Sequence, residues 1–349
     1  MTSLDYSLLQ KHTVEIYHLR EHQSDITHVR ARMLLKPQRF DLFAKLFYIE
    51  NRQTDHARAM AVYSAHIKAF NPDEKEPGRS DKNRLDDFVA AFDDIIDHFK
   101  DHDYDETQSV VPVDKNGVIL DGAHRVSALA YYDKDVTIAV FRDVEAKCDF
   151  DYEYFIDRGM ARSICDIVAY EMTRRCDTML VACLWPRLGN EASKSLALQR
   201  ISQNHQIAYC KKLIVNQKSM TRFVREIYQS QSWTKNPQAV QDKAVRIYGN
   251  GNHRIWCVFF ESGVSLDNIL QEKEQLRAQF GFAKDSVHMT DNAQETEQIA
   301  YLSLTQDGLS EWKDDLSRFR FEDVMAEKWH YFKKVTWMNL KTKIWRLLH

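Results

Sequence analysis

The first hundred residues carry apolar side chains at intervals of three and four residues. This spacing places them on one face of a helix, so it predicts helices over residues 4–22, 36–70 and 84–100. The second stretch shows the pattern most clearly, through Phe40, Phe43, Ala44, Phe47 and Tyr48. A polar segment that contains proline and glycine, residues 72–82, predicts a loop between the second and third helices.

The middle of the chain changes to short apolar runs. Two runs flank Lys115, Asn116 and Gly117, and an Asn-Gly pair between apolar runs predicts a β-hairpin with a type I′ turn. The sequence Asp121-Gly-Ala-His-Arg125 then predicts a tight turn into a helix. A further strand is expected over residues 136–141.

The second half alternates between apolar runs and helical spacing. This alternation predicts α/β layers with some parallel pairing. Strands are expected at 179–185, 206–215, 254–260 and 287–289, and helices at 219–228, 236–248, 265–280 and 293–304.

The fold class is therefore α/β (α+β), in three parts. Residues 1–145 form a helical unit with the hairpin, residues 146–310 an α/β domain, and residues 311–349 a long helical segment. The last part mixes lysines with tryptophans, which is typical of an amphipathic helix on an anionic membrane surface. A terminal helix docked on the protein's own core explains the pattern equally well.

Composition narrows the classes of function. The chain of 349 residues has 48 Lys and Arg against 51 Asp and Glu, a net charge of −3, which disfavours a general nucleic-acid binder. No apolar run approaches the roughly 20 residues that span a bilayer. The six cysteines are scattered and contain no CxxC pair, so we expect reduced thiols in a cytoplasmic protein.

The turn at 121–125 has the chemistry of an anion site. Backbone N–H groups, the imidazole of His124 and the guanidinium of Arg125 meet at a helix N-terminus, where the helix dipole also favours a phosphate. The side chain of Asp121 could cap the helix or act as a base. The alternative is an ordinary helix start with a capping Asp121 and solvated His124 and Arg125.

This stretch resembles the phosphate-binding box of the ParB/sulfiredoxin superfamily, over roughly residues 108–142. The resemblance implies a ParB-like fold for the N-terminal unit and a phosphate held by Gly122, Ala123, His124 and Arg125. Sulfiredoxin chemistry needs a cysteine in the box. Ala123 and His124 stand there instead, which disfavours that activity.

A second group of polar residues lies upstream in an aromatic setting. Arg39, Asp41 and Lys45 fall in the first part of the stretch 36–70, and His66 follows near its end. Asp41 and Lys45 are four residues apart, so a simple salt bridge on one helix face would explain that pair. It explains less well why basic and aromatic groups concentrate here.

With these residues included, most of the chain resembles proteins of capsule and O-antigen gene clusters. The resemblance runs from Arg39-Phe-Asp41 through Tyr63-Ser-Ala-His66 and the box to Leu184-Trp185-Pro186, Trp233 and Lys284-Asp-Ser-Val-His288-Met-Thr-Asp291. It implies a phosphoribosyltransferase that moves ribofuranose 5-phosphate from phosphoribosyl diphosphate (PRPP) to a lipid-linked glycan, after which a partner phosphatase removes the phosphate. One departure is Thr234-Lys-Asn236, where the family pattern has a glycine-containing run.

A donor with a phosphate and a diphosphate needs two anion sites. The box would supply one, and Arg39, Lys45, His66 and Lys82 the other, with Mg²⁺ as a candidate clamp. The candidate bases, with their order left open, are Asp41, Glu76 and Asp121. Further candidates are Trp185, His288 and Asp291, although Asp291 also fits a helix cap and His288 a core or rim histidine.

Two rival functions remain at this stage. One is a ParB-like kinase that transfers a nucleotide phosphate to a small hydroxyl compound, and the other is a nucleotide-gated DNA-binding module. The net charge and the absence of a clear helix-turn-helix disfavour the second rival. The leading expectation is a cytoplasmic transferase, peripheral on the inner membrane face, without a nucleic-acid partner.

Overall fold

The computed structural model describes residues 4–73, 83–250 and 253–313 and confirms the mixed α/β class. The chain divides into two compact units, the first formed by residues 1–160 with 167–179 and the second by 161–166 with 180–349. The first unit therefore extends past residue 145, where the sequence pattern places its end. Glu76, Lys82 and nearly all of the expected C-terminal amphipathic helix lie outside the described residues.

Helices dominate the first unit. They are α1 (Lys11–Ile16), α2 (Phe40–Asn51), α3 (His56–Phe70), α4 (Leu85–Asp101), α5 (Ala123–Tyr131), α6 (Tyr152–Asp157) and α7 (Arg162–Arg175), the last of which contains the division between the units. The predicted helix 36–70 is two helices, because Asp55 caps a new helix by accepting from the Arg58 N–H. The predicted helix 4–22 is wrong. That stretch holds only short helical turns, whose apolar side chains pack on Val110, Phe141 and Val144.

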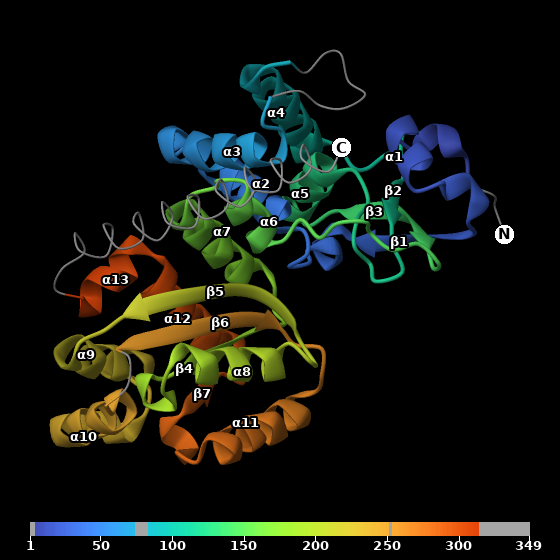
Figure 1. Ribbon diagram of the computed structural model, residues 1–349. Coiled ribbons are helices and arrows are strands. Elements are labelled where there is room, and N and C mark those ends of the chain that lie inside the picture. The colour runs from blue at the N-terminus through green and yellow to red at the C-terminus, as the bar shows by residue number, and fades with distance from the viewer. Residues whose placement is uncertain (1–3, 74–82, 251–252, 314–349) are drawn as a thin grey trace, which may run out of the picture. The chain divides into compact units, whose positions relative to one another are not determined.

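A three-stranded sheet accompanies these helices, with order β1-β3-β2 (Figure 1). Strand β2 (Val111–Val113) runs parallel to β3 (Asp135–Phe141), and β1 (Ser24–Arg30) runs antiparallel to it. The prediction of a strand at 136–141 is confirmed. Strand β1 was not predicted, because most of its residues are exposed and it carries no alternating apolar pattern.

The turn between β2 and the box differs from the predicted type I′ turn. Only Gly117 takes a positive φ, of 77°, while Asn116 does not, and the Gly117 N–H donates to the Asp114 carbonyl at 3.1 Å. This is a longer hairpin turn with one left-handed residue. The buried Asp114 carboxylate fastens it by accepting from the N–H groups of Asn116, Val118 and Ala146.

The second unit is built on a four-stranded sheet with order β5-β6-β4-β7. All four predicted strands are confirmed: β4 (Met179–Leu184), β5 (Gln206–Ile214), β6 (Arg254–Glu261) and β7 (Val287–Met289). The pairs β5–β6 and β4–β7 are antiparallel. A parallel pair, β2–β3, lies in the sheet of the first unit.

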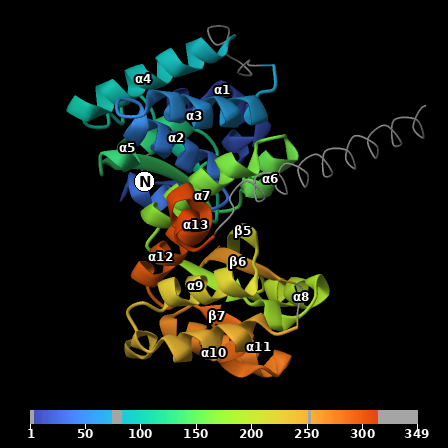
Figure 2. The ribbon, with the colours of Figure 1, turned by 90° about the vertical axis from the view of Figure 1, so that its left-hand side faces the viewer.

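Helices surround this second sheet (Figures 1 and 2). They are α8 (Glu191–Ile201), α9 (Gln217–Ile227), α10 (Pro237–Tyr248), α11 (Leu266–Phe280), α12 (Ala293–Leu304) and α13 (Gln306–Trp312). The four helices predicted for this half correspond to α9, α10, α11 and α12. Every residue of β4 is buried, so this strand lies at the centre of the unit's core.

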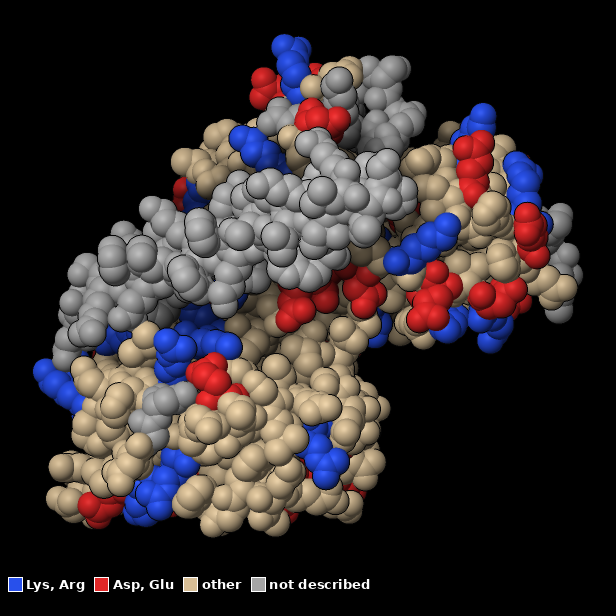
Figure 3. Space-filling view, in the orientation of Figure 1, with Lys and Arg blue, Asp and Glu red and all other residues tan. Residues whose placement is uncertain are grey.

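Charges of both signs mix on the surface of the first unit (Figure 3). Arg142 pairs with Asp25, Arg30 with Asp135, and Lys115 with Glu145. None of the helices in the described ranges combines the length and the apolar character needed to cross a membrane.

We expect Asp114→Ala to lower the free energy of unfolding by about 2 kcal/mol or more, because it leaves three backbone N–H groups without their acceptor. Chemical denaturation measures this change. The neighbouring Lys115→Ala is the control, since it removes only an exposed pair with Glu145 and should cost roughly 0.5 kcal/mol or less. Equal losses in the two variants would contradict the role given to Asp114.

Candidate functional site

The turn of the box, residues 121–125, contains a glycine that no other residue could replace without strain. Gly122 has a φ of 85° and stands directly before α5. A Cβ placed on it would lie 3.3 Å from Nη2 of Arg125 and 3.4 Å from Cγ2 of Val111. The left-handed backbone favours glycine here, and a Cβ would also displace the Arg125 guanidinium by a few tenths of an ångström. The guanidinium lies beside the first turn of α5, where the N–H groups of the helix have no partner within the helix.

His124 is positioned by two other helices. Its Nε2 lies 2.9 Å from the hydroxyl of Tyr63 on α3, and that hydroxyl also lies 3.3 Å from the carbonyl of Phe88 on α4. A carbonyl can only accept, so both bonds form when Tyr63 donates to Phe88 and Nε2–H of His124 donates to Tyr63. The imidazole also meets the ring of Phe92 edge-on at 4.7 Å. These contacts fix both the orientation and the tautomer of His124.

Asp121 does not cap the helix. The position before α5 is Gly122, and no side chain accepts from the first turn. One carboxylate oxygen, Oδ2, lies 3.8 Å from Nη2 of Arg125, is shielded from solvent and accepts no hydrogen bond within the described structure. This oxygen therefore has the charge of Arg125 nearby but no hydrogen-bond donor within the described structure. The alternative of a merely capping Asp121 is therefore wrong.

The upstream residues form a buried network. Arg39 donates from Nε and Nη2 to the two oxygens of Asp41, at 2.8 and 2.9 Å. Lys45 donates to Oδ2 of Asp41 at 2.8 Å and lies 3.2 Å from Nε2 of His66. All four side chains are buried. The simple surface salt bridge between Asp41 and Lys45 is thus replaced by a core network.

Burial and charge decide the protonation states in this network. Burial alone would raise the pKa of Asp41, but the charges of Arg39 and Lys45 hold it well below its usual range. For His66, burial and then the charge of Lys45 lower the pKa well below its usual value. Asp41 is therefore a carboxylate that is hard to protonate, and such a group is a poor general base.

Arg39 also connects the network to the box. Its Nη1 donates to the carbonyl of Ile119 at 2.6 Å, two residues before Asp121. Every nitrogen of this guanidinium thus has a protein acceptor. The geometry assigns Arg39 to holding the chain that leads into the box, in place of direct contact with a phosphate.

The other three candidates belong to the second unit. Trp185 is fully buried beside His288, with ring centroids 6.3 Å apart. His288 is 6% exposed, and its Nδ1 lies 3.1 Å from the hydroxyl of Tyr228. Asp291 is not the helix cap that its position suggested, because Asn292 accepts from the Glu295 N–H and Asp291 lies 3.7 Å from Lys273.

A cavity of about 570 Å³ brings His288, Trp233 and Lys284, which belong to the resemblance, together with residues that the sequence analysis did not select. Most of them are cations that face one another only after folding. The lining comprises Tyr228, Trp233, Ala239, Asp242, Lys243, Arg246, Lys273, Arg277, Lys284 and His288. The available signal was the spacing of Lys243 and Arg246, and of Lys273 and Arg277, which puts each pair on one helix face.

Metal ligands do not cluster in the described ranges, where no three His, Cys, Asp or Glu residues are placed to hold an ion. Mg²⁺ at phosphate sites often takes one or two carboxylates together with phosphate oxygens. Asp121 is the box residue that could supply such a carboxylate. Comparisons of the chain with protein-family models, with curated proteins and with solved structures return no match.

His66 should make stability depend on pH. The pKa of His66 is lowered in the folded state, so on acidification this imidazole takes up a proton in the unfolded chain before it does so in the folded chain. The free energy of unfolding therefore falls as the pH drops below about 6.5. We expect His66→Gln to flatten this fall in thermal unfolding measured between roughly pH 7 and 5.

The matched control is His56→Gln, at the exposed start of the same helix, which should keep the pH dependence of the wild type. If the stability of His66→Gln falls with pH as steeply as that of the wild type, the buried imidazole is not the group that titrates.

Proposed function

We propose that the chain is a PRPP-dependent glycosyltransferase, which adds ribofuranose 5-phosphate to a lipid-linked glycan in surface polysaccharide assembly. The observation that carries the proposal is the geometry at Gly122, where a left-handed glycine opens α5 and the Arg125 guanidinium lies against its first turn. This geometry agrees with the phosphate-binding box that the sequence resembles. The resemblance along the remaining chain supplies the donor and acceptor classes.

The box would hold one phosphate group of the donor. The N–H groups of the first turn of α5, which have no acceptor within the helix, favour a dianion at this position together with the helix dipole. Arg125 offers a planar fork for two phosphate oxygens. His124, already held through Nε2 by Tyr63, keeps its ring beside the first turn of the helix.

The reaction exchanges one bond at the anomeric carbon of the donor. An acceptor hydroxyl oxygen forms a bond to that carbon, the bond from the carbon to the diphosphate oxygen breaks, and inorganic pyrophosphate leaves with the bonding electrons. By analogy with glycoside hydrolysis the transition state resembles an oxocarbenium ion. The hydroxyl proton passes to a base.

Asp121 suits the role of base best among the three candidates. Its Oδ2 accepts no hydrogen bond within the described structure, whereas both oxygens of Asp41 are bound by Arg39 and Lys45. Glu76 lies outside the described residues. We therefore assign proton acceptance to Asp121 and a positioning role to Asp41.

The second anionic group of the donor needs other partners. Arg39 is committed to Asp41 and Ile119, and Lys45 contacts Asp41 and His66, so neither is a free cation for a diphosphate. Mg²⁺, when bound, would neutralise charge on the leaving pyrophosphate. Lys82, in the segment after residue 73, stays a candidate of this proposal.

The same proposal places the protein on the cytoplasmic face of the inner membrane, where lipid-linked glycans would meet it. The basic and aromatic residues beyond residue 313 would supply the membrane contact. A partner phosphatase would then remove the transferred 5-phosphate, and no nucleic acid takes part.

The direct test incubates the full chain with PRPP, Mg²⁺ and a panel of short-chain lipid-linked glycan acceptors. We expect acceptor-dependent release of pyrophosphate and a product whose mass has increased by one ribose phosphate. Absence of both with every acceptor, while PRPP does not bind and ATP or CTP binds tightly to the wild type but not to Arg125→Ala, would replace this proposal with the nucleotide-dependent kinase.

Substitutions in the box should weaken donor binding without unfolding the chain. We expect Arg125→Ala to reduce the affinity for PRPP by about 10- to 100-fold in calorimetric titration, since a charged hydrogen-bonding partner of phosphate is lost. Arg125→Lys should recover only part of the loss, because an ammonium lacks the planar fork.

The control is Arg142→Ala, which removes an exposed arginine paired with Asp25 in the same unit and should leave the affinity unchanged. Equal affinities of wild type and Arg125→Ala would return the turn to a structural helix start.

A further inference from the structure

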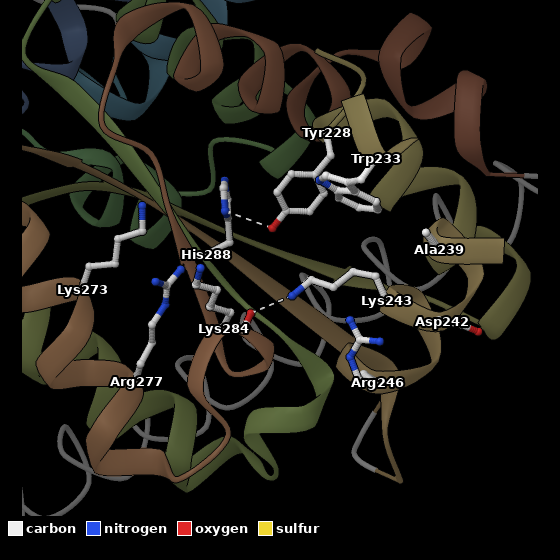
Figure 4. A pocket seen from close by; sticks show the side chains of 10 residues that line it. All are labelled: Tyr228, Trp233, Ala239, Asp242, Lys243, Arg246, Lys273, Arg277, Lys284 and His288. Atoms are coloured by element: carbon white, nitrogen blue, oxygen red, sulfur yellow. Dashed lines mark hydrogen bonds between the residues drawn. The ribbon is translucent and has the colours of Figure 1, made fainter. Parts of the chain in front are cut away.

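The cavity in the second unit is lined by cations from three segments (Figure 4). Lys243 and Arg246 extend from α10, and Lys273 and Arg277 extend from α11. Lys284, between α11 and β7, joins them. Figure 4 shows the two helical pairs on opposite sides of the cavity, with His288 next to the ring of Tyr228.

Nearby carboxylates do not balance this charge. Asp285 is shared between Lys243, at 2.7 Å, and Arg246, at 3.2 Å. Asp291 stays 3.7 Å from Lys273 and accepts no hydrogen bond from it. No carboxylate of the described residues pairs with Lys284, and Asp242 is the single acidic residue of the lining. The residues that line the cavity therefore carry more positive than negative charge, although Glu274, outside the lining, also pairs with Arg277 at 2.6 Å.

The burial of these cations strengthens the repulsion between their charges. Desolvation lowers the pKa of Lys243; the bond to Asp285 opposes that shift, and the charges of Arg246 and Arg277 add to it. Arg277 is 7% exposed and is held by the Val287 carbonyl and by Glu274. A bound anion would relieve the mutual repulsion of such closely placed cations.

Two aromatic side chains, Tyr228 and Trp233, form another part of the cavity wall. The rings of Tyr228 and Trp233 lie 5.4 Å apart at 52°, and both side chains are partly exposed where they line the cavity. His288 supports this wall through the bond of Nδ1 to the Tyr228 hydroxyl. Its Nε2 is 3.2 Å from Oε1 of Glu295, but the geometry is not that of a hydrogen bond. A buried polar atom thus remains unsatisfied beside the cavity.

We propose that this cavity binds a nucleoside diphosphate, either free or as part of a nucleotide sugar. Its volume of about 570 Å³ is larger than one phosphate requires and falls in the range of small-molecule sites. Cations on two sides suit the spread charge of a diphosphate. The faces of Trp233 and Tyr228 offer a stacking surface to the base.

This inference is independent of the proposed transferase activity. The cavity and all its lining residues lie in the second unit, whereas the box belongs to the first. Variants of the box should therefore leave nucleotide affinity unchanged. A nucleotide that binds in this cavity would also not count as support for the rival kinase, which would use the box.

The test titrates the full chain with UDP, ADP and CDP and with inorganic pyrophosphate, by calorimetry at low salt. We expect at least one nucleoside diphosphate to bind about tenfold or more tightly than pyrophosphate, because only the nucleotide also stacks. Affinity should fall as salt is added. The absence of binding by all four compounds would overturn the inference, and equal affinities for pyrophosphate and every nucleotide would refute the stacking wall.

Variants locate the bound nucleotide. Lys273→Gln and Arg246→Ala should each weaken binding by about tenfold, and Trp233→Ala should reduce the affinity for the nucleotide to that for pyrophosphate. The control is Arg254→Ala, since Arg254 is a half-exposed arginine of the same unit that lies 3.7 Å from Glu191 and outside the cavity. Retained affinity in both Lys273→Gln and Arg246→Ala would place the nucleotide elsewhere.

Discussion

The buried carboxylate of Asp41 is the constraint on which the first unit depends. Two cations, Arg39 and Lys45, must remain beside it, because a carboxylate in the core is costly unless it is paired and hydrogen-bonded. Arg39 in turn reaches the carbonyl of Ile119, and the Phe40 N–H beside it donates to the carbonyl of Phe150. Removal of one partner would leave an uncompensated charge in the core, which typically costs about 3–5 kcal/mol. The start of α2, the approach to the box and the chain near residue 150 are thus held at one point.

This network shows the limit of helical spacing as a guide to a site. Spacing places Asp41 and Lys45 on one helix face, but it does not show whether that face meets solvent, a ligand or the core. The turn into α5 was easier to predict, because a glycine before a helix is a local feature. The contact of His124 with Tyr63 is not local, since it joins residues 61 positions apart.

The same distinction between local and distant effects applies to the fold. Helices with a clear apolar face were predicted from the period of their apolar positions. The strands of the second unit were predicted as short apolar runs, and β4, β6 and β7 are indeed buried along nearly their whole length. Strand β1 was missed because it is an edge strand with most side chains exposed. Residues 4–22 have helical spacing, but their apolar side chains pack on β3 and its flanks instead of forming one helix. The cavity of the second unit could not be predicted as a site, since α10 and α11 meet around it only in the folded chain.

Charge balance limits what the first unit can bind by itself. A donor with a phosphate and a diphosphate brings several negative charges, and ion pairs of that strength need cations that are not already neutralised. Among the box residues only Arg125 carries a permanent positive charge, and Asp121 stands 3.8 Å from it. The charges of Arg39 and Lys45 are offset by the carboxylate of Asp41. His66 adds no positive charge, because burial lowers its pKa and keeps the imidazole neutral. Under the proposed function, the box accounts for one phosphate group of the donor. The remaining charge of the donor would then need partners other than Arg39 and Lys45, because Asp41 already neutralises both of these cations.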